Sequence, residues 1–138
     1  MIIDCHGHYT TTPASHQDFR DAQLTWLDAP QGPPPTPADI SDEQIRDSIA
    51  SNQLRILHER GGDFMIFSPK ASGMEHHVAD ASIAQAWARR CNDLIHRVTT
   101  LFPNNFAGVC QLPQTANGDL TPVVDELRRC VNELDFVG

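Results

Sequence analysis

Basic residues are scarce in this sequence: ten Lys and Arg stand against eighteen Asp and Glu, which gives a formal net charge of -8. A surface that binds nucleic acid or an anionic membrane needs a basic patch to displace counterions. The sequence contains no such patch, so we expect neither nucleic acid nor membrane as a partner. A small anionic substrate stays open, because a few local cations can override the overall charge.

Long apolar runs are also missing, and none approaches the roughly 20 residues that span a bilayer. The start of the chain, residues 1–4, has neither the basic region nor the cleavage site of a secretory signal. We therefore expect a cytoplasmic protein. The cysteines lack the Cys-x-x-Cys pairing of a structural zinc site, and we expect buried free thiols instead. They are Cys5, Cys91, Cys110 and Cys130.

The first clear helix signals follow a proline-rich stretch at residues 28–38. We interpret this stretch as an excursion loop within one domain, residues 1–138. Ser41 and Gln44 form a capping box, so we expect a helix from there to about residue 60, ended by Gly61. Its expected buried stripe is Ile45, Ile49, Ile56 and Leu57. A less regular pattern indicates a helix around residues 19–27.

Two more helices follow from periodicity and capping. The first runs from Asp80 until Pro103 stops it, and the second begins at Pro122 with Thr121 as its cap. The apolar stripe expected on the second comprises Val123 or Val124, Leu127, Val131 and Leu134.

Strands are expected between these helices, at residues 1–9, 64–67 and 106–112, with a fourth beginning at 136–138. The continuous apolar run at 64–67 is typical of a strand covered on both faces. Strands that alternate with helices favour a parallel sheet with right-handed crossovers. The expected fold class is therefore α/β, with about three to four parallel strands.

His6 and His8 end the first expected strand, with Gly7 between them. Side chains two apart on a strand project to the same side, so both imidazoles can reach one ion. They suit zinc, although zinc usually takes three or four protein ligands. Cys5 points away on an ideal strand. Asp4 shares the face of His6, where it either orients that ligand or caps a neighbouring strand end.

The opening residues 2–8 resemble the amidohydrolase superfamily, whose members are metal-dependent (β/α)8 barrels of the TIM type. Further segments resemble the 4-oxalomesaconate hydratase family within it. They are Ile40-Ser41-Asp42-Glu43, Asn52-Gln53-Leu54-Arg55, Glu59-Arg60-Gly61, Ile66-Phe67-Ser68-Pro69, Trp87-Ala88, Phe106-Ala107-Gly108-Val109-Cys110-Gln111-Leu112-Pro113, Cys130-Val131-Asn132-Glu133-Leu134 and Phe136-Val137-Gly138.

This resemblance implies a hydro-lyase that adds water to 4-oxalomesaconate, or its enol, in the catabolism of protocatechuate and gallate. It implies that His6 and His8 are metal ligands, to zinc, and that the remaining ligands lie beyond Gly138. The 138 residues would then be the N-terminal part of a barrel, and inactive alone. Two residues depart from the family pattern: Lys70 replaces an expected arginine, and Asp135 an expected glycine.

Substrate contacts are open at three further residues. Lys70, just after the second strand, is placed to meet a carboxylate of a di- or tricarboxylate substrate, yet a loop lysine is often only solvated. His76 and His77 follow in the same loop, where they either contact substrate or form an exposed polar pair.

Two other functions stay open beside the hydratase. One is a decarboxylase of a muconate semialdehyde, which shares the metal pair and the barrel. The other is a non-enzymatic α/β module that associates into a homo-oligomer through an unpaired strand edge.

Overall fold

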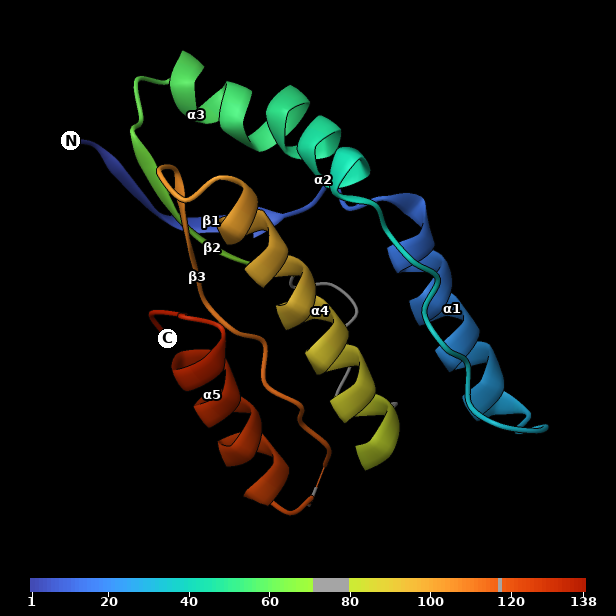
Figure 1. Ribbon diagram of the computed structural model, residues 1–138. Coiled ribbons are helices and arrows are strands. Elements are labelled where there is room, and N and C mark those ends of the chain that lie inside the picture. The colour runs from blue at the N-terminus through green and yellow to red at the C-terminus, as the bar shows by residue number, and fades with distance from the viewer. Residues whose placement is uncertain (71–79, 117) are drawn as a thin grey trace.

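A computed structural model describes residues 1–70, 80–116 and 118–138, in which three strands alternate with helices (Figure 1). The elements are β1 (Ile3–Tyr9), α1 (Ala14–Asp28), α2 (Asp42–Ile49), the π-helical segment η1 (Ala50–Leu54), α3 (Arg55–Glu59), β2 (Phe64–Pro69), α4 (Ala81–Leu101), β3 (Phe106–Gly108) and α5 (Thr121–Glu133).

The three strands form one parallel sheet in the order β1-β2-β3. The pairing joins Ile3 to Phe64 and His8 to Ser68, and its register shifts between Asp4 and Gly7. The parallel sheet expected from the alternating elements is confirmed. The register shift is a bulge, and bulges re-aim side chains near functional sites.

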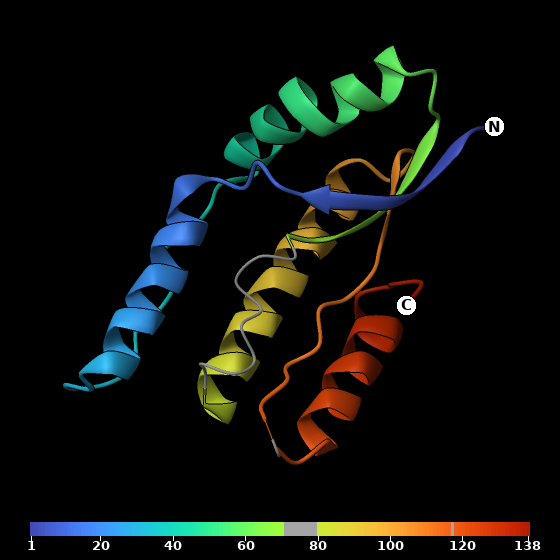
Figure 2. The same ribbon diagram turned by 180° about the vertical axis from the view of Figure 1, so that it is seen from behind.

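One face of the sheet carries the hydrophobic core. Tyr9, Met65, Phe67 and Phe106 are buried there against residues of α2 and α4. In Figure 2, β1 and β2 lie in front of α4, and no described helix covers the opposite face. Burial alternates along β2, so the expectation that both faces of this strand are covered is wrong for the described residues.

The helical stretch from α2 to α3 starts as expected. Ser41 Oγ accepts from the Gln44 N–H, and the Gln44 side chain accepts from the Ser41 N–H. Gly61 follows its end with φ +73°, the left-handed conformation that glycine adopts without strain.

Within this stretch, η1 changes which residues face the core. The buried positions are Ile45, Ile49, Gln53 and Leu57, a spacing of four that a widened π turn permits. Ile56 is 37% exposed, so its expected place in the buried stripe is wrong. A regular α-helical period does not anticipate the extra residue in the turn.

Helix α4 matches its expected span, and the side chain of its N-cap Asp80 accepts from the Ile83 N–H at 2.9 Å. Helix α5 differs from expectation in the face it buries. Its buried side chains are Glu126 and Cys130, whereas Val124, Leu127 and Val131 are exposed. Polar partners on α4 turn the Glu126 face inward, a cause that an apolar pattern cannot reveal.

Strand β3 is shorter than expected, since it ends at Gly108. Residues 136–138 form no strand in the described structure, but the Val137 N–H donates to Gly108 O and the Cys110 N–H donates to Gly138 O, each at 2.9 Å. The expected fourth strand is therefore wrong as a strand, although its residues lie beside β3. Asp135, just before these residues, has φ 57°. This is the left-handed conformation expected of a residue at the end of a helix.

Helix α1 begins five residues before its expected start at 19, and residues 29–41 after it form neither helix nor strand. Cys91 and Cys130 are buried, Cys110 is half-buried and Cys5 is exposed. The expectation of four buried thiols is thus wrong for Cys5. Among the described residues no helix combines the length and the apolar character needed to cross a membrane.

Candidate functional site

The carboxyl end of β1 brings His6 and His8 together. Their ring centroids lie 4.9 Å apart, with 72° between the ring planes. His6 is exposed and His8 is half-buried. Asp4 Oδ1 accepts from the His6 N–H at 3.0 Å, so this carboxylate touches the backbone of His6 within the bulge of β1. The two imidazoles are close enough to share one ligand.

Hydrogen bonds to the end of β2 hold the ring of His8 in place. Its Nδ1 lies 3.0 Å from Pro69 O and 2.7 Å from Ser68 Oγ, and Ser68 Oγ itself donates to Gly7 O. Because a carbonyl only accepts, Nδ1 is the donor in this contact, and Nε2 is the ring nitrogen left for a further ligand. Histidines that bind metals commonly donate their other ring N–H to a carbonyl in this way.

Two adjoining cavities open beside His8, and we name them together the His8 cleft. They measure about 210 and 270 Å³ and share His8 and Ser68. The first is also lined by Cys5, His6, Gly7, Ile66 and Val109, and the second by Pro69, Cys110, Gln111, Leu112 and Gln114. Cys5, expected to point away, therefore lines the same cavity as His6, because the bulge departs from an ideal strand.

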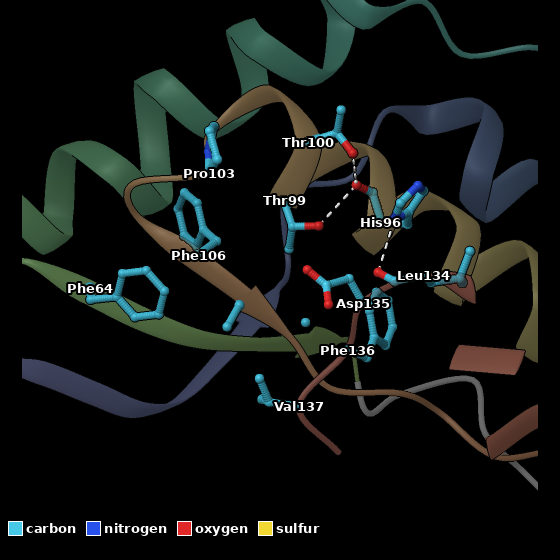
Figure 3. A pocket seen from close by; sticks show the side chains of 12 residues that line it. Phe64, His96, Thr99, Thr100, Pro103, Phe106, Leu134, Asp135, Phe136 and Val137 are labelled. Carbon is cyan, nitrogen blue, oxygen red and sulfur yellow. Dashed lines mark hydrogen bonds between the residues drawn. The ribbon is translucent and has the colours of Figure 1, made fainter. Parts of the chain in front are cut away.

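A larger cavity of about 570 Å³ lies elsewhere in the molecule (Figure 3). Phe64 and Phe106 place it at the starts of β2 and β3, and His96 in its wall donates from Nδ1 to Leu134 O at 3.1 Å. Ligands of parallel α/β proteins bind at the carboxyl ends of the strands. Position and donor chemistry thus favour the smaller His8 cleft as the candidate site.

Gln53 contacts the end of β1 that carries His8, and this role was not predicted from the sequence. Its side chain is buried, accepts from Thr11 Oγ1 at 2.8 Å, and donates to Thr10 Oγ1 at 3.2 Å and to His8 O at 3.5 Å. The widened turn of η1 directs this amide toward the end of β1. One sequence signal could have revealed this role of Gln53: the residue is polar at a position where the helix period predicts an apolar one.

The other expected site residues divide between described and undescribed parts of the chain. Lys70 follows β2 directly and is exposed. His76 and His77 lie in the segment 71–79, outside the described residues. In the parts of the chain that the structure describes, no group of three His, Cys, Asp or Glu side chains is arranged to hold a metal ion.

The sequence pattern characteristic of the amidohydrolase family matches residues 3–138. The chain belongs to the amidohydrolase family. A curated relative, the 2-keto-4-carboxy-3-hexenedioate hydratase of Sphingobium sp. (strain NBRC 103272 / SYK-6), is 55% identical over 138 residues, which are 100% of this chain and 40% of the relative. The gamma-resorcylate decarboxylase of Polaromonas sp. (strain JS666 / ATCC BAA-500) is 36% identical over 90 residues, 65% of this chain and 26% of that enzyme.

Solved structures of two other enzymes have the same fold as this amidohydrolase chain over its whole length or nearly so. The crystal structure of 4-oxalomesaconate hydratase from Rhodopseudomonas palustris superposes with a TM-score of 0.91 at 40% identity, over 100% of this chain and 41% of that chain. A dihydroxybenzoic acid decarboxylase from Polaromonas sp. JS666, with bound manganese and the inhibitor 2-nitroresorcinol, superposes with a TM-score of 0.61 at 28% identity. The match covers 99% of this chain and 36% of that chain. The chain thus spans about two fifths of the length of these hydratases and matches the N-terminal portion of their (β/α)8 barrels.

Proposed function

We propose that this amidohydrolase chain supplies the first two metal ligands, His6 and His8, of a hydro-lyase that adds water to 4-oxalomesaconate or its enol. The product would be 4-carboxy-4-hydroxy-2-oxoadipate. The observation that carries the proposal is the 55% identity to a hydratase over the whole chain. At that identity, the aligned residues commonly keep the same substrate class, whereas fold alone does not imply function.

The donor set fits a divalent metal, and we propose zinc. Nε2 of His8 is the ring nitrogen left for a metal, because Nδ1 donates to Pro69 O, and His6 lies beside it. Two imidazoles are fewer than the three or four ligands usual for zinc. The remaining ligands are proposed to come from outside the described residues. When bound, the metal would polarise water or a substrate oxygen.

The chain's own residues would bind and orient the substrate. Lys70 carries a cation at the carboxyl end of β2, where a carboxylate of a di- or tricarboxylate could pair with it. Lysine forms this pair as a point charge, without the two parallel hydrogen bonds of arginine. We keep His76 and His77 as substrate contacts, and Asp4 as a residue that fixes the backbone of His6.

An alternative function is the decarboxylation of a muconate semialdehyde. It is supported by 36% identity to a gamma-resorcylate decarboxylase, over 65% of this chain. A self-associating module without activity is the remaining alternative, supported by the exposed apolar side chains of α5. A role in the catabolism of aromatic compounds and a cytoplasmic location belong to the hydratase proposal.

Product analysis on the full-length gene product tests the reaction. Incubation with 4-oxalomesaconate should yield a product heavier by one water, without release of carbon dioxide. Carbon dioxide release from a muconate semialdehyde, with no water addition, would favour the decarboxylase. An absence of turnover with both substrates would contradict both enzymatic proposals.

Metal titration tests the ligands independently of turnover. Zinc should bind tightly and stoichiometrically to the full-length protein, and His6→Ala with His8→Ala should weaken this binding at least about a hundredfold. His58→Ala is the matched control, because His58 is exposed on α3, away from the cleft. Unchanged affinity in the double variant would remove His6 and His8 from the metal site.

A further inference from the structure

Ser68 lies in the wall of both cavities that make up the His8 cleft. Strands β1 and β2 run parallel, and their register pairs His8 with Ser68. Side chains of paired residues project from the same face of a sheet, so the hydroxyl of Ser68 stands beside the imidazole of His8. Ser68 is half-buried, and its Oγ makes two contacts with β1.

The two contacts together determine which atom donates in each. Ser68 Oγ donates to Gly7 O at 3.1 Å, and a hydroxyl has only one hydrogen to give. In the contact of 2.7 Å between Ser68 Oγ and His8 Nδ1, the ring nitrogen is therefore the donor. Pro69 O accepts from the same Nδ1 at 3.0 Å. One N–H of His8 is thus shared between two acceptors, and the hydroxyl of Ser68 is the nearer one.

Packing fixes the far end of this chain of hydrogen bonds. Gly7 is buried, and a Cβ at its position would clash with the side chain of Met65 on β2. The backbone of β1 therefore lies against β2 as only glycine allows, and Gly7 O has little freedom to move. Ser68 joins the ring of His8 to this fixed carbonyl and so restrains the rotation of the ring.

His6 has no comparable support in the described part of the chain. Its backbone N–H donates to Asp4, and its ring stands 4.9 Å from that of His8. Among residues 1–70, 80–116 and 118–138, the ring of His6 makes no hydrogen bond. A ligand that is already oriented loses less freedom when it binds, so the restraint on His8 favours metal binding.

We propose that Ser68 is a positioning residue, whose hydroxyl holds the ring of His8 with Nδ1 toward β2 and leaves Nε2 for a divalent metal. The proposal rests on the proposed role of His8 as a metal ligand. Its geometry rests on the hydrogen bonds that Ser68 Oγ makes with His8 Nδ1 and Gly7 O, and it does not depend on which reaction the metal serves.

Zinc titration of the full-length protein tests the effect on the metal. Ser68→Ala should weaken zinc binding about tenfold, and Ser68→Thr, which keeps the hydroxyl, should stay within about twofold of wild type. Ser51→Ala is the matched control, because Ser51 is exposed on η1 and should leave zinc affinity unchanged. Unchanged zinc affinity in Ser68→Ala, whatever its unfolding temperature, would leave Ser68 a structural role at most and overturn the proposal.

A second measurement needs no metal. In zinc-free protein with nitrogen-15 in its histidines, at mildly alkaline pH, NMR shows which ring nitrogen carries the proton. We expect Nδ1 of His8 to carry it in wild type and in Ser68→Thr. In Ser68→Ala a measurable share of His8 should be protonated at Nε2 instead, whereas His6 should not change. A wild-type His8 protonated at Nε2, or a His8 unaffected by Ser68→Ala, would overturn the proposal.

The failure of the metal site and the failure of this proposal give different results. Zinc affinity unchanged in His6→Ala with His8→Ala would refute the metal site, and the protonation of His8 would still decide whether Ser68 orients the ring. Zinc affinity lost in that double variant but intact in Ser68→Ala would confirm the metal ligands and refute the role of Ser68.

Discussion

His16 shows how burial changes the chemistry of one side chain. It is 6% exposed in the first turn of α1 and stacks on Trp87 of α4, with 4.6 Å between ring centroids. Burial, helped by the nearby charges of Arg90 and Lys70, lowers its pKa to about 4 from the ordinary value of 6.5. At neutral pH this imidazole is therefore an uncharged part of the contact between α1 and α4.

A pH-dependent stability follows from this lowered pKa. The unfolded chain takes up the proton near pH 6.5 and the folded chain only near pH 4, so the stabilisation is complete above 6.5 and disappears as the pH falls to 4. The loss should reach about 3 kcal/mol. His16→Phe keeps the aromatic stack and should flatten this slope in urea unfolding at pH 7, 5 and 4. An equally steep slope in His16→Phe would assign the pH dependence to other groups.

Glu126 makes the opposite case, a buried charge that its partners maintain. Because its folded pKa lies below the ordinary 4.5, its contribution is present above pH 4.5 and is lost as the pH falls through the folded value. Glu126→Gln leaves the side chain of Arg129 without this partner and should lower the free energy of unfolding by about 3 kcal/mol at pH 7. The difference should shrink in acid, as chemical denaturation can measure. A difference independent of pH would indicate a packing effect instead.

At the scale of elements, η1 connects helix geometry to the candidate site. Gln53→Leu keeps the volume but removes the hydrogen bonds to Thr10, Thr11 and His8 O. Zinc affinity of the full-length protein should fall about tenfold, as for other residues that support metal ligands. Gln17→Leu, the same change on an exposed face of α1, should leave affinity unchanged. Unaltered zinc affinity in Gln53→Leu would show that the position of His8 does not depend on the hydrogen bonds of Gln53.

Elements were predictable where their signals are local. The capping box of Ser41, the N-cap Asp80 and the turn at Asp135 each depend on neighbours a few residues away, and the strand spacing of His6 and His8 is equally local. Gln53 meets Thr11 across 42 positions and Asn92 meets Glu126 across 34. Such contacts decide which face of a helix is buried, and periodicity carries no information about them.

At the scale of the whole molecule, the described fold leaves apolar surface and strand edges open. The sheet order makes β1 and β3 its two edges. Helix α5 lies beside α4 (Figure 1), and several of its apolar side chains are exposed. Leu120 is 70% exposed at its start, followed by Val124, Leu127 and Val131 at 38 to 44%. Open strand edges and exposed apolar stripes of this kind favour association.

The 138 residues expressed alone should therefore self-associate, with a sedimentation coefficient that rises with protein concentration. Val124→Glu with Val131→Glu should weaken this association at least about tenfold, because the pair places charge within the apolar stripe of α5. Asn104→Glu with Asn132→Glu adds the same charge at two exposed polar positions and should have little effect. A sedimentation coefficient independent of concentration in the unmodified chain would mean that the open sheet and the stripe on α5 do not drive association.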